Sequence, residues 1–256
     1  MIRRYKNGDY MTDVSVLLGS GGISTPERRE LYRKLSSEHF SKCSEVLFIP
    51  YASDDWDSYT SRMKELMGEG GPGIVGIQSF PDHQTAVRES EAIYVGGGNS
   101  FLLIRELHKR GLVEIIRDAV RAGIPYMGVS AGSNVACPQM STTNDMPIVH
   151  PPSFDSIGIV PFQINPHFHP GKIRFLDGEN LVEHFGESRA QRISEFHRHN
   201  DTPVLGMWEG SFVLWDGFRG RLFGRATAFL AGSEPFEMDD GSEFDSTLQN
   251  PSRNPS

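Results

Sequence analysis

The sequence predicts an α/β fold in which helices cover both faces of a mostly parallel sheet. Short apolar runs alternate with longer amphipathic runs through the first half of the chain, and glycine-rich segments follow three of the apolar runs. Such alternation is typical of strand–helix–strand units, whose parallel strands are buried on both faces. With 256 residues the chain is long enough for one well-cored α/β domain but short for two.

The five expected strands of the first half are short apolar runs bounded by glycine or polar residues. They cover residues 14–18, 46–50, 73–77, 92–95 and 126–129. Because the reactive loops of parallel sheets lie beyond the carboxyl ends of the strands, we expect the functional site at the glycine-bearing segments 19–22, 96–100 and 128–132.

Amphipathic runs between these strands predict the covering helices. The clearest begins after Thr25, the expected N-cap, has Pro26 in its first turn, and continues to residue 40. A second helix is expected over residues 57–67, and a third runs from residue 101 towards residue 122.

After residue 138 the pattern is irregular and then mainly β. The expected elements are a strand at 157–164, a polar stretch at 174–187, a helix at 188–199 and strands at 203–208, 212–215 and 221–223. Asp216-Gly217 marks a turn between the last two strands. Residues 239–256 hold few apolar anchors, so we expect a single domain over 1–238 and a disordered acidic tail over 239–256.

Composition restricts the class of protein. A net charge of −8 and a pI near 5.6 argue against a nucleic-acid partner, which would need a basic face. No stretch approaches the length of a membrane span, and no apolar run follows the basic residues 1–6 as a secretory signal would require. Two cysteines are too few for a disulfide framework. We therefore expect a cytoplasmic protein without membrane contacts.

The segment Gly128-Val129-Ser130-Ala131-Gly132 matches the G-x-S-x-G pattern, and an apolar strand precedes it. In that pattern the serine occupies a sharp strand-to-helix turn, where its hydroxyl is exposed as a nucleophile. The sequence therefore predicts a nucleophilic Ser130, and the alternative is a serine in an ordinary turn.

A serine hydroxyl needs a neighbouring base that takes its proton. His167 directly follows an apolar run, so a loop would bring it over the sheet. Six other histidines lie in polar settings where we expect them to be solvated: His39, His83, His108, His184, His197 and His199. The alternative for His167 is a structural loop histidine.

The base in turn needs a buried carboxylate that orients it and stabilises the imidazolium. Asp145, in Thr142-Thr143-Asn144-Asp145, and Glu209, at a strand end, both qualify, and the sequence leaves both open. The backbone amides of Gly98 and Ala131 are the expected donors to a developing oxyanion. The alternative for the triple glycine is a phosphate-binding loop, although it lacks the spacing of known phosphate-binding loops.

A metal site is the competing chemistry. His167 and His169, together with His150 and Asp145, could supply mixed nitrogen and oxygen ligands. The chain contains neither an H-E-x-x-H motif nor a cysteine cluster, so we expect no metal.

Four segments together resemble the peptidase E family of α-aspartyl dipeptidases: residues 96–100, 128–138, 142–149 and 163–168. The resemblance implies a serine peptidase on a flavodoxin-like sheet, similar to class I glutamine amidotransferases, that needs no metal or organic cofactor. It implies Ser130 as the nucleophile and His167 as the base. The family's third residue has been placed at both Asp145 and Glu209, so this choice stays open.

The implied substrate is a dipeptide with an N-terminal aspartate, Asp-Xaa, whose β-carboxylate calls for a cation. Arg189 matches a family arginine and is the first choice, Arg192 is the second, and Asn99 is a further candidate substrate contact. Ser141 and Val129 depart from residues found in some relatives, which suggests an altered substrate range.

We expect hydrolysis of Asp-Xaa through an acyl-enzyme. The assembly that we consider is a homodimer. The enzymatic alternative is a cyanophycinase-like hydrolase of β-aspartyl bonds. The alternative from another class is a non-catalytic protein that binds a nucleotide or metabolite through the glycine loop.

Overall fold

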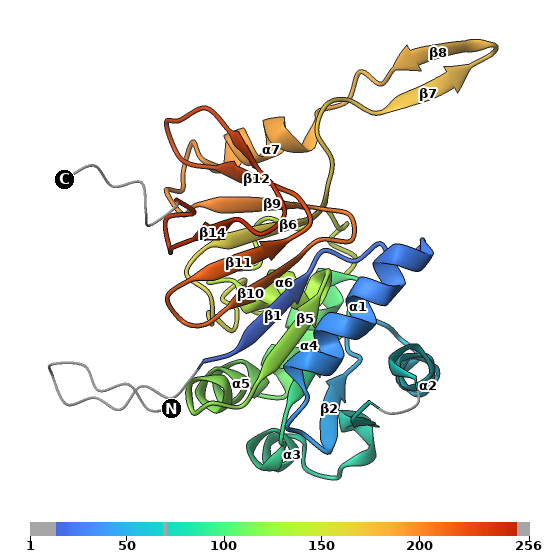
Figure 1. The fold of residues 1–256 in the computed structure, drawn as a ribbon, viewed down its shortest axis with the longest axis vertical. Helices are drawn as coiled ribbons and strands as arrows, with labels where there is room; N and C mark the ends of the chain where they lie inside the picture. The colour runs from blue at the N-terminus through green and yellow to red at the C-terminus, as the bar shows by residue number, and fades with distance from the viewer. Residues whose placement is uncertain (1–13, 69–70, 250–256) are drawn as a thin grey trace, which may run out of the picture.

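The computed structural model describes residues 14–68 and 71–249, so the basic start of the chain and residues 250–256 of the predicted tail lie outside it. Within the described ranges, the chain forms an eight-stranded sheet, a four-stranded sheet and a separate two-stranded hairpin (Figure 1). This confirms the predicted α/β class. None of the described helices is long and apolar enough to cross a bilayer.

The large sheet has the strand order β14-β11-β10-β1-β5-β4-β2-β3. Its five parallel strands lie within a few residues of the ranges expected for the first half of the chain: β1 (Val16–Gly19), β2 (Glu45–Ile49), β3 (Gly73–Gly76), β4 (Ile93–Val95) and β5 (Tyr126–Val129). Three strands extend it antiparallel beside β1: β10 (Phe212–Trp215), β11 (Gly220–Phe223) and β14 (Glu243–Phe244). The carboxyl ends of β1, β4 and β5 therefore lie side by side.

Helices cover both faces of this sheet. Side chains alternate between the two faces of a strand, and in these strands the side chains on both faces are apolar. In β2, Val46 and Phe48 pack on one side, with α1 (Pro26–His39) and α2 (Trp56–Met67). Leu47 and Ile49 pack on the other, where the helices are α3 (His83–Glu89), α4 (Ser100–Lys109), α5 (Leu112–Arg121) and α6 (Ala131–Ala136). A short 3₁₀ turn, Ile77–Ser79, precedes α3.

The second sheet packs against the same core as α3 to α6. It contains β6 (Gln163–Phe168), β9 (Val204–Trp208), β12 (Ala226–Phe229) and β13 (Phe236–Met238), in the order β13-β12-β9-β6. Its outer face carries α7 (Arg189–Phe196), whose Ile193 packs on Phe168 and Phe229. One continuous core cluster thus joins both sheets, from Val16 to Leu248.

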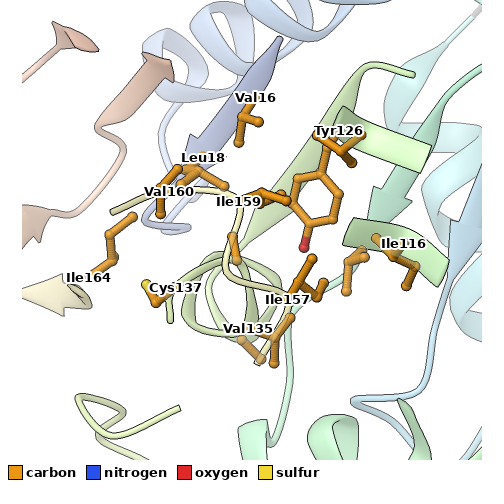
Figure 2. Packing of buried hydrophobic residues seen from close by; sticks show 14 of the residues in the cluster. Val16, Leu18, Ile116, Tyr126, Val135, Cys137, Ile157, Ile159, Val160 and Ile164 are labelled. Atoms are coloured by element: carbon orange, nitrogen blue, oxygen red, sulfur yellow. The ribbon is translucent and has the colours of Figure 1, made fainter. Parts of the chain in front are cut away.

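Figure 2 shows the centre of this cluster, where the Tyr126 ring points between α6 and the irregular segment that precedes β6. The ring is fully buried, and its hydroxyl donates a hydrogen bond to the carbonyl oxygen of Gly132 at 2.7 Å. The interaction ties β5 to the helix that follows it.

Several elements differ from the sequence prediction. The helix expected over 101–122 is divided into α4 and α5, because Gly111 adopts φ 65° and interrupts the helical path. The strand expected over 157–164 begins only at residue 163. Helix α3 and strands β12 and β13 were not predicted, and each is short. The N-cap of α3 is Asp82, whose side chain accepts from two N–H groups of the first turn.

The predicted disordered tail also differs from the structure over residues 239–249. Strand β14 pairs with β11, and both Phe244 and Leu248 are fully buried. The Phe244 ring contacts the rings of Trp215 and Phe162, with centroids 6.5 and 5.8 Å apart respectively. These two buried side chains hold in place a segment whose composition is otherwise polar, because the Phe244 ring packs against aromatic rings of the core.

The polar stretch after β6 forms the hairpin β7 (Arg174–Asp177) and β8 (Asn180–Glu183). It projects away from the body of the molecule (Figure 1). Almost all of its residues are exposed, including Leu176 and Leu181.

His39, expected to be solvated, is partly buried at the end of α1. Its Nε2 lies 3.0 Å from the carbonyl oxygen of Tyr126, and its Nδ1 lies 3.5 Å from Ser15 Oγ. Burial lowers the pKa of His39 to about 4 from an ordinary 6.5, although the Tyr126 carbonyl opposes this shift. The folded state therefore holds the imidazole neutral.

We expect this histidine to make folding sensitive to mild acid. As pH falls from 6.5 towards 4, the unfolded chain gains a proton that the folded chain does not. The free energy of unfolding of the wild type should therefore decrease by on the order of 1–3 kcal/mol because of this histidine. The His39→Gln variant should lack this contribution to the decrease. Urea unfolding of both proteins at pH 7, 5.5 and 4 measures the effect. Parallel pH dependences would contradict it.

Candidate active site

Ser130 lies on the sharp turn between β5 and α6. Its backbone adopts φ 55° and ψ −111°, a left-handed conformation that is uncommon for a residue other than glycine. A Cβ on Gly132 would lie 2.1 Å from the carbonyl oxygen of Val95, and one on Gly128 would lie 2.4 Å from that of Gly132. The two glycines of the pattern are therefore required for close packing of the turn, as in a nucleophile elbow.

His167 contacts this turn from the second sheet. Its Nε2 lies 2.8 Å from Ser130 Oγ, which is hydrogen-bonding distance. His167 also has a positive φ, 55°, and it lies in an irregularity of the β6–β9 pairing. The structure thus joins the two residues that the sequence had placed 37 positions apart.

Glu209 lies on the other side of the imidazole. It follows β9, and its Oε1 lies 2.8 Å from His167 Nδ1. With Nδ1–H donating to this carboxylate, Nε2 carries the lone pair that faces Ser130. The sequence predicted a buried carboxylate here, whereas the Glu209 side chain is 39% exposed.

Asp145 makes no hydrogen bond or ion pair with His167. Its Oδ2 accepts hydrogen bonds from the backbone N–H and the hydroxyl of Ser100, both at 2.7 Å, at the start of α4. An acidic group at a helix N-terminus interacts favourably with the N–H groups that have no partner within the helix and with the helix dipole. Of the two carboxylates left open by the sequence, Glu209 is therefore the one hydrogen-bonded to the imidazole.

The triple glycine lies against the serine. A Cβ on Gly97 would lie 3.1 Å from Ser130 Cβ, and one on Gly98, where φ is 135°, would lie 2.3 Å from the carbonyl oxygen of Ala52. Ala131 is the first residue of α6, so its N–H has no partner within the helix. Asn99 is the N-cap of α4, since its Oδ1 accepts from the N–H groups of Phe101 and Leu102.

Of the two arginines, Arg189 lies nearer the centre of the site. Its Nη1 donates to the carbonyl oxygen of Pro166, next to His167, at 3.0 Å. Burial lowers its pKa, while the nearby carboxylates of Glu209 and Asp145 act in the opposite direction. Arg192 instead pairs loosely with Glu187 at 3.9 Å, and its side chain is 58% exposed.

Comparison with known proteins identifies the family. Residues 15–222 match the sequence profile of "Peptidase family S51". The chain belongs to peptidase family S51. It is 44% identical over 205 residues to a protein of Streptomyces coelicolor named "Peptidase E", covering 79% of this chain and 82% of that one. It is 43% identical over 199 residues to a "Probable alpha-aspartyl dipeptidase" of Drosophila melanogaster, covering 77% and 78%.

Solved structures resemble the fold of this S51 family member. One is the "Crystal structure of a peptidase from an acI-B1 Actinobacterium", with a TM-score of 0.65, 17% identity and coverage of 92% of this chain and 98% of that one. Another is a "Putative Peptidase E Protein from Listeria monocytogenes EGD-e", with a TM-score of 0.56, 20% identity and coverage of 90% and 98%. At these identities the comparison supports the fold alone.

The residues weighed as alternative metal ligands do not form a cluster among the described residues of this S51 family member. His150 is exposed, and the imidazole of His167 is occupied by Ser130 and Glu209. Across residues 14–68 and 71–249, no three His, Cys, Asp or Glu side chains lie close enough to hold a metal ion.

The loop Gly19-Ser20-Gly21-Gly22 borders the site, as the sequence predicted, although no single residue of it was assigned a role. A Cβ on Gly21, where φ is 104°, would lie 2.7 Å from His167 Cε1. A Cβ on Gly22, where φ is 73°, would lie 1.7 Å from Glu209 Oε2. The position of this loop after β1 was the available signal, because it ends beside β5 in the parallel sheet.

We expect Gly22→Ala to break the hydrogen bond between His167 and Glu209. The added methyl group occupies the position of the carboxylate, whose flexible side chain must turn away. Gly232→Ala is the matched control, because Gly232 has φ 72° but no atom within 4 Å of an added Cβ. Both variants incur a left-handed strain of about 1–2 kcal/mol. Crystal structures of the two should show Glu209 displaced only in Gly22→Ala; an unmoved carboxylate would refute the expectation.

Proposed function

We propose that the protein is a serine dipeptidase that hydrolyses Asp-Xaa through an acyl-enzyme. The observation that carries the proposal is the continuous hydrogen-bonded chain from Ser130 Oγ through His167 to Glu209, with both distances 2.8 Å. A nucleophile, a base and an orienting carboxylate in this order are the parts needed for acyl transfer. The names of the relatives, "Peptidase E" and "Probable alpha-aspartyl dipeptidase", support the substrate class.

In the proposed reaction, Ser130 Oγ attacks the carbonyl carbon of the aspartyl residue, and its proton passes to His167 Nε2. Glu209 stabilises the imidazolium that forms and keeps the ring oriented. The imidazolium then donates the proton to the leaving amine, so that the peptide bond breaks and an aspartyl ester remains on Ser130. Water, deprotonated by the same imidazole, hydrolyses that ester.

The oxyanion of each tetrahedral intermediate would be stabilised by the N–H groups of Gly98 and Ala131. Both belong to segments that border Ser130, and neither N–H has a protein acceptor among the described residues. Donors that are already oriented require little reorganisation as charge develops.

The β-carboxylate of the substrate would bind Arg189, and Arg192 and Asn99 remain weaker candidates. Arg189 is partly buried next to the imidazole, so its interaction with a substrate anion would be screened less than that of the exposed Arg192. The bonds that Asn99 makes as a helix cap occupy its side-chain oxygen.

A flavodoxin-like sheet is the finer fold assignment that we propose. When the parallel strands are counted from β2, the order β3-β2-β4-β5 corresponds to 2-1-3-4, the start of the flavodoxin-like order. A cytoplasmic location and a homodimer stay predictions.

We expect Ser130→Ala to lose more than about a thousandfold in the turnover of Asp-Leu, because no other hydroxyl can form the ester. Its thermal unfolding midpoint should stay close to that of the wild type. Release of aspartate from α-linked and β-linked Asp-Leu measures both activity and linkage preference. Substantial residual hydrolysis would refute the nucleophile, and preference for the β-linked peptide would favour a cyanophycinase-like activity.

We expect Glu209→Gln and Asp145→Asn to differ in turnover. An amide at 209 no longer stabilises the imidazolium and can favour the wrong tautomer, so kcat should fall by roughly a hundredfold to ten-thousandfold. An amide at 145 can still accept from Ser100, so the loss should stay within about tenfold. Steady-state kinetics of both variants decide the matter, and a larger loss in Asp145→Asn would reverse the assignment.

A further inference from the structure

The imidazole of His167 is carried by a bulge in the second sheet. Asn165 pairs with Gly206, and Phe168 pairs with Trp208, so two residues of β6 stand opposite Met207 alone. An extra residue of this kind interrupts the ladder and re-aims a side chain, and such bulges are frequent beside active sites. One of the two residues, Pro166, has no N–H, so the bulge leaves the ladder short of donors.

The hydroxyl of Ser20 fills the interruption. Ser20 Oγ accepts a hydrogen bond from the backbone N–H of His167 at 2.8 Å and donates one to the carbonyl oxygen of Met207 at 3.0 Å. A regular ladder would satisfy these backbone groups directly from strand to strand. Here one buried side chain from the loop after β1 completes the pairing between β6 and β9.

The loop that holds Ser20 is fixed to all three parts of the site. The carbonyl oxygen of Gly19 accepts from the N–H of Ser130 at 2.9 Å. The carbonyl oxygen of Gly21 accepts from the N–H of Gly210, directly after Glu209, at 2.8 Å. Ser20 supplies the bond to His167 between these two, so the loop relates the positions of nucleophile, base and carboxylate.

From this geometry we propose that Ser20 is a positioning residue, whose hydroxyl holds His167 in its left-handed conformation and thereby aims Nε2 at Ser130. Without the hydroxyl, the N–H of His167 and the carbonyl of Met207 lose their bridge. Two unsatisfied buried backbone groups favour closure of the bulge by direct pairing, which turns the imidazole away from the serine. Ser20 itself touches no reacting atom.

The matched control is Ser211, whose hydroxyl also makes two backbone hydrogen bonds, both to Arg225. Its hydroxyl accepts from the N–H of Arg225 at 2.9 Å and donates to the carbonyl of Arg225 at 2.8 Å, and the residue is 2% exposed. The carbonyl oxygen of Ser211 accepts from the backbone N–H of Ser20 at 2.9 Å, and Ser211→Ala keeps this backbone bond. Ser20→Ala and Ser211→Ala therefore each remove a buried hydroxyl with two backbone bonds. Only the first removes a bond to His167.

The experiment compares the wild type, Ser20→Ala, Ser20→Cys and Ser211→Ala. It measures kcat and KM for Asp-Leu, the thermal unfolding midpoint, and the rate of reaction with diisopropyl fluorophosphate. In that reaction a bond forms between Ser130 Oγ and phosphorus, the P–F bond breaks, fluoride leaves, and the hydroxyl proton passes to His167. The rate thus reports the alignment of Ser130 and His167 independently of the peptide substrate.

For Ser20→Ala we expect kcat and the phosphorylation rate to fall together by about tenfold to a hundredfold, the effect of a displaced catalytic group, with KM within about twofold. Ser20→Cys, whose thiol is a weaker hydrogen-bonding group, should lie between it and the wild type. Ser211→Ala should show a similar loss in unfolding midpoint while its kcat stays within about twofold. If Ser20→Ala does not fold, Ser20→Cys and Ser211→Ala are compared at matched stability.

An unchanged phosphorylation rate in both Ser20 variants would overturn the proposal, as would an equal loss of activity in Ser211→Ala. This inference rests on the proposed function, but the two fail differently. A wild type that reacts with the fluorophosphate and does not cleave Asp-Leu would refute the proposed substrate and leave the test of Ser20 intact.

Discussion

The hydrogen bond between Ser130 and His167 joins two layers of the molecule. Ser130 ends a strand of the large sheet, whereas His167 belongs to the second sheet, so the 2.8 Å distance between them depends on how the two sheets pack. One shared core fixes that packing, with Leu18 and Tyr126 on one side and Ile164 and Met207 on the other. Because interiors are close-packed, a change of core volume between the sheets would be transmitted to the distance between Ser130 and His167.

Both residues of this hydrogen bond have positive φ, and the surrounding structure has to hold them there. Such conformations each cost about 1–3 kcal/mol in a residue other than glycine and persist only where the surroundings determine them. At Ser130 the surroundings are two closely packed glycines and the carbonyl of Gly19; at His167 they are a bulge bridged by Ser20. The loop after β1 contributes to both, which makes it a structural centre of the site.

Much of the fold followed from local pattern. The five parallel strands and α1 were predictable because buried strands are short apolar runs and because Thr25 and Pro26 mark a helix start. The division of the helix at Gly111 was not, since a single glycine does not always end a helix. Residues 239–249 are structured because Phe244 and Leu248 are buried in the core. Composition does not show which apolar side chains of a polar segment will be buried.

For the site, the sequence by itself determined the types of group present: a serine in a glycine-framed turn, a histidine after an apolar run and two eligible carboxylates. Only the tertiary structure shows that Glu209 contacts the imidazole and Asp145 a helix N-terminus, because both residues follow plausible loops and a carboxylate can accept hydrogen bonds from either partner. The loop that contains Ser20 was expected at the site, but the role of its hydroxyl could not be predicted, for the same reason. A hydrogen bond between residues 147 positions apart is decided by how strands are arranged in space, and spacing along the chain does not record that arrangement.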